Sequence, residues 1–226
     1  MSFWKPGQTG PDFDLEADRY GSEHTTTFHF NPNVARDIRR QRLLLPIASY
    51  RDAIIEHVET YSTLIILGLS GCGKSTQIPQ YLYESGFASQ TASTSVSSTA
   101  KRFSNKNCQI IACVQPTKTA ALMLAARIAE EQGSCVGKGG IVGCSAQYFS
   151  HTDDSTCKIK VLTCENMLRE LHRDPLLMRY SAIMIDQVDD RDAFMDILFG
   201  AIKNIKMKRS NLHIVLCAST TSAVKL

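Results

Sequence analysis

The chain has 226 residues, of which 43% are hydrophobic and 21% are charged, and its formal net charge is +3. This length suits one α/β domain, with or without a tail, and the composition is too apolar for a chain that is disordered throughout. No apolar run is long enough to cross a bilayer, so we expect no membrane partner. The small positive charge permits nucleic-acid binding without arguing for it.

The eight cysteines form no C-x-x-C pair and lack a nearby histidine pair at zinc-ligand spacing. The first residues also lack the apolar stretch of a secretory signal. We therefore expect a soluble protein of the cell interior with reduced thiols, and neither disulfides nor a zinc site.

Residues 1–43 are polar and contain turn-forming pairs such as Pro6-Gly7 and Asn31-Pro32, which predicts an N-terminal extension before a domain over residues 44–226. Within that domain, short apolar runs alternate with segments of helical spacing. The predicted strands cover Thr63–Leu67, Gln109–Val114, Lys158–Thr163, Tyr180–Ile185 and Leu212–Cys217. The predicted helices cover Tyr50–Tyr61, Lys74–Glu84, Lys118–Glu131, Glu165–His172 and Ala193–Ile205. This alternation predicts an α/β fold with a parallel sheet covered by helices on both faces.

Residues 88–107 interrupt this alternation because they are rich in serine and threonine and almost free of large apolar side chains. We expect a disordered insertion on the surface of the domain. A phosphorylated regulatory loop is the less favoured alternative.

Residues 68–75 read G-L-S-G-C-G-K-S, a full match to the phosphate-binding pattern G-x-x-x-x-G-K-[ST] between a predicted strand and a predicted helix. The glycines let backbone N–H groups point at phosphate oxygens, and the helix adds its positive N-terminal end. Lys74 supplies a cation for the β- and γ-phosphates, and the Ser75 hydroxyl supplies a ligand for Mg²⁺. The predicted nucleotide-binding residues of this P-loop are Gly68, Ser70, Gly71, Cys72, Gly73, Lys74, Ser75 and the following Thr76.

Asp186 follows the apolar run S-A-I-M-I, at the strand end where ligands bind in parallel sheets. We predict that Asp186 is the Walker B aspartate, which holds Mg²⁺ directly or through water together with Ser75. The alternative is an acid that only caps the next turn.

Four motifs carry a family resemblance: G-K-S-T-Q-I-P-Q-Y-L from Gly73, Q-P-x-K-x-A-A from Gln115, A-R-I-A-E-E from Ala126 and D-Q-V-D-D-R from Asp186. Together they resemble the first RecA-like domain of the DEAH-box RNA helicases, and T-Q-I-P-Q directly after a P-loop is highly specific. The opening F-W-K-P-G-Q-T-G-P resembles the start of a short, spliceosome-associated member.

The resemblance implies that the chain binds ATP and Mg²⁺ and that Arg127 stacks on the adenine. It also implies sequence-independent RNA contacts along Pro116, Lys118 and Thr163. Ala218-Ser219-Thr220 stands where the family has S-A-T, a segment that couples nucleotide state to strand separation. The implied partners are RNA and spliceosomal or helicase-cofactor proteins, and the implied location is the nucleus, otherwise the cytoplasm.

The departures from the family concern catalysis and RNA. Asp186-Gln187-Val188-Asp189 stands where the family has D-E-A-H. Because an amide cannot act as a base, Gln187 is a degraded general-base position, and such a loss lowers rates by about 10²–10⁴-fold. Thr117 stands at a family arginine. Thr163-Cys164-Glu165 stands where the family has T-D-G, which places an acid near the implied RNA path, so we expect modest RNA affinity.

The sequence ends at Leu226, before the second RecA-like domain and the arginine fingers that the family uses, which are worth about 10³–10⁵ in rate. We therefore predict a protein that binds ATP·Mg²⁺ and RNA, with hydrolysis and unwinding weak or lost. The alternative is a functional RNA helicase or ATPase in splicing or RNA processing, with the missing domain supplied in trans. A small-molecule kinase and a decayed gene product are less favoured.

Overall fold

The computed structural model describes residues 38, 40–88, 109–147, 149–190 and 192–219, all within one compact unit, Pro32–Leu226. Most of the predicted extension, and the predicted insertion except for the buried Ala88, lie outside these residues. The predicted domain boundary at residues 43 and 44 stays a prediction.

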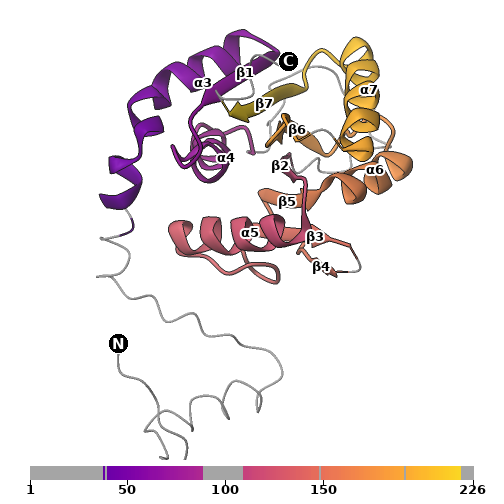
Figure 1. Cartoon of the computed structure of the whole chain (residues 1–226). Helices are drawn as coiled ribbons and strands as arrows, with labels where there is room; N and C mark the ends of the chain where they lie inside the picture. Colours follow the sequence, from indigo (N-terminus) through magenta and orange to yellow (C-terminus); the bar gives the residue numbers. More distant parts are fainter. Residues whose placement is uncertain (1–37, 39, 89–108, 148, 191, 220–226) are drawn as a thin grey trace, which may run out of the picture. The chain divides into compact units, whose positions relative to one another are not determined.

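The described helices and strands alternate along most of the chain, except that β3, β4 and β5 follow one another (Figure 1). The helices are η1 (Pro46–Tyr50, a 3₁₀ helix), α3 (Arg51–Thr60), α4 (Lys74–Glu84), α5 (Lys118–Gln132), α6 (Cys164–Arg173) and α7 (Ala193–Lys208). The strands are β1 (Thr63–Gly68), β2 (Ile110–Gln115), β3 (Val142–Ala146), β4 (Phe149–His151), β5 (Ile159–Thr163), β6 (Tyr180–Ile185) and β7 (His213–Ser219).

These strands form one seven-stranded sheet in the order β1-β7-β6-β2-β5-β3-β4. Every pair is parallel except β3 with β4, which is antiparallel. The P-loop strand β1 therefore lies beside β7, and β7 lies beside β6, the strand that leads into Asp186. Because parallel strands point the same way, the loops after β1, β6 and β7 meet at one edge of the sheet.

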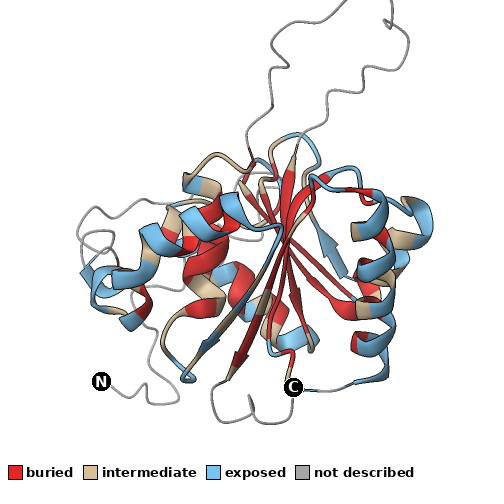
Figure 2. Cartoon of the chain, turned by 90° about the horizontal axis from the view of Figure 1, so that it is seen from above, coloured by how far each residue is buried: buried red, intermediate tan, exposed pale blue. Residues whose placement is uncertain are grey.

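Helices cover both faces of the sheet, and Figure 2 shows the buried strands between the two helical layers. On one face, Ile111 and Cys113 pack in the cluster that also contains side chains of α3, α4 and α5. On the other face, Ala112 and Val114 pack with side chains of α6 and α7. This alternation along β2 explains its continuous apolar sequence, since both of its faces are buried.

The predicted α/β fold is confirmed as a mostly parallel seven-stranded sheet with helices, consistent with the RecA-like P-loop domain. The five predicted strands and five predicted helices are all present, and β6 and α4 have the predicted bounds. Two strands, β3 and β4, were not predicted from the sequence.

β3 (V-G-C-S-A) has one large apolar side chain, Val142, and its Gly143 is needed for space. A Cβ added at Gly143 would lie 2.7 Å from Thr152 Cγ2 and 2.9 Å from Cys157 Sγ. The sequence of β3 is therefore set by close packing against the following loop rather than by strand propensity.

The seven cysteines in the described part of the chain are free thiols. Over the same residues, no group of three or more His, Cys, Asp or Glu side chains is arranged to hold a metal ion by itself. None of the described helices combines the length and the apolar character that a membrane crossing requires.

Candidate nucleotide-binding site

The loop between β1 and α4 has the backbone conformation of a phosphate-binding turn. Gly71 and Gly73 have φ angles of 79° and 99°, in the left-handed region that favours glycine. Gly73 is also the residue before α4, and a Cβ there would lie 3.0 Å from Leu45 Cδ1 and 3.1 Å from Ile47 Cγ2. The chain before β1 therefore packs directly on the loop, and Ile47 N–H donates to Cys72 O at 3.3 Å.

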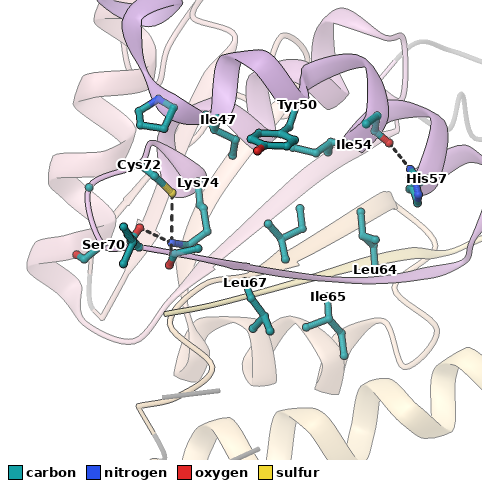
Figure 3. Close-up of a pocket in the computed structure, with 16 residues that line it drawn as sticks. Ile47, Tyr50, Ile54, His57, Leu64, Ile65, Leu67, Ser70, Cys72 and Lys74 are labelled. Carbon is teal, nitrogen blue, oxygen red and sulfur yellow. Dashed lines mark hydrogen bonds between the residues drawn. The ribbon is translucent and has the colours of Figure 1, made fainter. Parts of the chain in front are cut away.

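Lys74 is buried, and its ammonium group is held inside the loop. It donates to Gly68 O at 2.7 Å and to Leu69 O at 2.9 Å, and it lies 3.6 Å from Cys72 Sγ (Figure 3). These contacts keep the cation at the start of α4, where a phosphate group would meet it. An ammonium group has three N–H donors, so a phosphate can bind Lys74 by replacing the weak contact with Cys72 Sγ while both carbonyl oxygens stay bound.

Asp186 is buried directly after β6, and both of its carboxylate oxygens accept hydrogen bonds. Gln115 Nε2 donates to Oδ2 and the Gln187 backbone N–H donates to Oδ1, each at 3.0 Å. These bonds fix the Asp186 side chain at the edge of the sheet where the parallel strands end.

Gln187 has an exposed side chain and a φ of 51°, which a non-glycine residue adopts only at a cost of order 1–3 kcal/mol. The turn is held on either side of Gln187. The Val188 N–H donates to Cys217 O at 3.1 Å, and the Asp190 N–H donates to Gln187 O at 3.0 Å. These hydrogen bonds hold the backbone of Gln187 in this conformation.

Two buried thiols, Cys113 and Cys217, lie close behind Asp186 on β2 and β7. Burial raises the pKa of both thiols, and the negative charge of Asp186 raises each pKa further. They therefore stay protonated and act as small apolar side chains beneath the carboxylate.

A cleft of about 540 Å³ joins the P-loop to the ends of β6 and β7. Of the predicted nucleotide-binding residues, the structure places Ser70, Gly71, Gly73, Lys74, Ser75, Thr76, Arg127 and Asp186 along its walls. Gln187 and Asp189 line the same cleft, as do Ala218 and Ser219. The Ser219 N–H donates to Asp189 Oδ1 at 3.4 Å, which connects the end of β7 with the turn after β6.

A second cavity of about 700 Å³ lies between β1 and the segment η1–α3 (Figure 3). It is lined by Gly68 and Cys72, and also by Ser70, Gly71 and Lys74, which the two cavities share. Its walls are mainly apolar and include Ile47, Ile54 and Leu64, and no acidic residue lines it. A triphosphate with its metal needs polar and charged partners, so the 540 Å³ cleft fits it better.

A network around Glu131 borders the cleft and was not predicted from the sequence. The buried Glu131 carboxylate accepts from Gln77 Nε2 at 2.8 Å, from Gln80 Nε2 at 2.7 Å and from Arg127 Nε at 2.7 Å. Arg42 Nε lies 3.7 Å from it and also donates to Gln77 Oε1 at 2.9 Å. Gln77 and Gln80 are the two glutamines of T-Q-I-P-Q, so much of that motif holds α4 against α5.

The residues predicted to contact RNA lie along the same sheet edge, beyond β6. Gln115 at the end of β2 pairs with Thr163 at the end of β5, which places Pro116 and Lys118 beside Thr163. Lys118 is exposed, whereas Thr163 is buried and its hydroxyl oxygen has no hydrogen-bond partner among the described residues. Thr117 caps α5, because its hydroxyl accepts from Ala120 N–H at 3.2 Å.

The residues present fit a Mg²⁺ ion that is shared with nucleotide phosphates. Mg²⁺ usually takes one or two protein oxygens and completes its shell with water and phosphate oxygens. Asp186 and Ser75 offer oxygens of this kind, and both line the cleft. When bound, the ion supplies positive charge against the phosphates.

The fold and this cleft define a class, the P-loop nucleotide-binding domains with a RecA-like sheet. No protein-family model matches the chain. Over its whole length it is 36% identical to a "Probable ATP-dependent RNA helicase DHX35" of Homo sapiens, of which it covers 30%. It is also 38% identical, over 82% of its length, to the Schizosaccharomyces pombe protein named "Putative pre-mRNA-splicing factor ATP-dependent RNA helicase", of which it covers 26%.

The similarity confirms the family that the motifs predicted: the chain is homologous to the DEAH-box RNA helicases. It spans about 30% of the length of such a relative and so corresponds to part of a helicase.

Proposed function

We propose that this chain binds ATP with Mg²⁺ in the 540 Å³ cleft and that Gln187 makes hydrolysis slow. The supporting observation is the meeting of Lys74 and Ser75 with Asp186 in one cleft that also contains Gln187. Lys74 and the loop N–H groups bind the β- and γ-phosphates, and Ser75 and Asp186 hold the metal ion. Arg127, which lines the same cleft, stacks on the adenine.

Gln187 separates binding from hydrolysis in this proposal. Its amide can hydrogen-bond a water molecule but cannot take a proton from it, whereas a glutamate can. Exchange of glutamate for glutamine keeps the side-chain length and removes a negative charge near the phosphates. We therefore expect ATP affinity to survive while turnover falls by about 10²–10⁴-fold relative to a glutamate enzyme.

RNA is the proposed second ligand, along Pro116, Lys118 and Thr163. The names of the relatives support an RNA ligand and, for the fission-yeast protein, splicing and hence a nuclear location. Because Thr117 caps α5 where the family has an arginine, fewer cations face this edge, and we expect weak, salt-sensitive binding.

Calorimetric titration of the purified chain with ATP in excess Mg²⁺ tests the proposal, with Lys74→Ala as the matched variant. We expect saturable binding by the wild type and roughly 10- to 100-fold weaker binding by the variant, since hydrogen bonds to charged groups contribute about 1.5–3 kcal/mol. Absence of binding by the wild type, or equal binding by both proteins, would contradict the proposal. Rapid RNA-stimulated turnover by the wild type would instead favour a working ATPase.

A further inference from the structure

Glu131 is a charged side chain in an unusual place, because its carboxylate is only 2% exposed at the end of α5. A buried carboxylate is strongly unfavourable unless hydrogen bonds and positive charges compensate it. Here its Oε2 accepts from Gln77 and Gln80 of α4, and its Oε1 accepts from Arg127. The sequence therefore places a buried charge where an uncharged side chain could also fill the space, which calls for a role beyond packing.

The two oxygens of Glu131 face different structures. Oε2 faces α4, the helix that begins at Lys74, through the two glutamine amides, and Arg42 Nε lies 3.7 Å from the same oxygen. Oε1 faces Arg127, one helical turn earlier on α5, and forms a 2.7 Å ion pair with its Nε. Oε2 of Glu131 thus bonds to the helix that begins at Lys74, and Oε1 bonds to Arg127.

Arg127 is anchored to a buried carboxylate through its inner nitrogen, whereas its outer nitrogens bond only to exposed side chains. Its side chain is 40% exposed, and its outer nitrogens reach the exposed Glu130 at 3.2 Å and Gln41 at 3.4 Å. Both Arg127 and Glu131 line the nucleotide cleft. A guanidinium group anchored at Nε keeps the orientation of its plane, and a fixed plane stacks on an aromatic base with less loss of side-chain entropy.

We propose that Glu131 is a positioning residue, which orients Arg127 and so sets the affinity of the cleft for the nucleotide base rather than for the phosphates. This inference rests on the proposed nucleotide binding. It predicts that loss of the Glu131 charge weakens ligands that carry a base and leaves bare phosphates unaffected. A residue that only fastens α4 to α5 would weaken both classes of ligand together, because α4 carries Lys74.

The test compares ADP with pyrophosphate, which offers the same two phosphates without ribose or base, in calorimetric titrations with Mg²⁺. In Glu131→Gln the side chain keeps its size and one carbonyl oxygen for α4 but loses the charge that holds Arg127. We expect about tenfold weaker ADP binding, within the range of a cation–π contact, and pyrophosphate affinity within about twofold of wild type. Glu131→Asp, which keeps the charge but withdraws it by one methylene, should show the same selective loss.

Glu130→Gln is the matched control, because Glu130 also pairs with Arg127 but is exposed. An exposed pair contributes little, so ADP affinity should change by no more than about twofold. In an Arg127→Ala background, Glu131→Gln should cause no further loss of ADP affinity, because both changes remove the same contact.

Equal losses of ADP and pyrophosphate, additive losses with Arg127→Ala, or unchanged ADP affinity in both Glu131 variants would each overturn the inference. If the wild type bound neither ligand, the proposed nucleotide function would fail and the inference with it. If the wild type bound both and the variants kept full ADP affinity, only the inference about Glu131 would fail.

Discussion

The two sides of the 540 Å³ cleft differ in how completely they match the motifs of the helicase family. On the P-loop side, the pattern is complete, the glycines have the left-handed backbone that the turn needs, and Lys74 is held by two carbonyl oxygens. On the β6 side, Asp186 is fixed by two hydrogen bonds, but the next residue is Gln187 instead of a glutamate. In the proposed function, the first side carries the groups that bind phosphate, and the second has glutamine at the position of the general base.

The proposed function therefore assigns binding and hydrolysis to separate residues of one cleft. A change at Gln187 leaves the phosphate-binding loop untouched, since the two lie on strands that β7 separates. Variants of Lys74 should therefore change ATP affinity, whereas variants of Gln187 should change the rate of hydrolysis.

Asp186→Asn should have the largest effect on nucleotide binding among changes on the β6 side. Removal of the carboxylate charge should lower ATP affinity in excess Mg²⁺ by roughly tenfold and bring it to the value measured with EDTA. Calorimetric titrations at several Mg²⁺ concentrations measure this. Asp190→Asn is the control, because Asp190 lines the same cleft but is exposed. Unchanged Mg²⁺ dependence in Asp186→Asn would contradict the metal-binding role.

Lys118→Ala should have a smaller effect, confined to RNA. Loss of one phosphate contact should weaken binding of a single-stranded RNA a few-fold and reduce the slope of log K against log salt by about 0.7. Fluorescence anisotropy over a range of salt concentrations measures both, with the exposed Lys203→Ala on α7 as the control. ATP affinity should not change. An equal effect of the two variants would contradict an RNA site at this edge.

His213 should affect stability alone, because it begins β7, at the opposite end of that strand from Ser219. Burial lowers the pKa of His213 in the folded chain, so the unfolded chain binds a proton more readily. The contribution of neutral His213 to the free energy of unfolding is therefore present above about pH 6.5, the ordinary pKa of histidine, and is lost as the pH falls below that value.

Thermal denaturation between pH 7.5 and 5.5 should show a smaller fall in melting temperature for His213→Gln than for the wild type. Nucleotide affinity at pH 7.5 should be unchanged. Parallel pH profiles for the two proteins would show that His213 does not titrate as expected.

Local sequence signals predicted the elements that position the cleft. β6 is a continuous apolar run that ends at Asp186, and α4 lies between Gly73 and the turn at Ser85-Gly86, so both have the predicted bounds. β3 was missed because tight packing around Gly143 replaces the usual apolar pattern.

The Glu131 network could not be predicted from the sequence for a different reason. Its contacts join residues that lie far apart in the chain, such as Gln77 with Glu131, and only the packing of α4 on α5 brings them together. Thr117 was interpreted as a lost RNA contact, and the structure adds that it caps α5. Motifs identify the chemistry of single positions, whereas the tertiary structure decides which motif residues form hydrogen bonds with one another.

The most direct test of the account is single-turnover hydrolysis of bound ATP by the wild type and by Gln187→Glu, under conditions where titration shows both proteins saturated. The account predicts similar ATP affinities and a rate about 10²–10⁴-fold higher for Gln187→Glu, because glutamate restores a base at a position of unchanged backbone geometry. A wild type that hydrolyses ATP as fast as Gln187→Glu would contradict it.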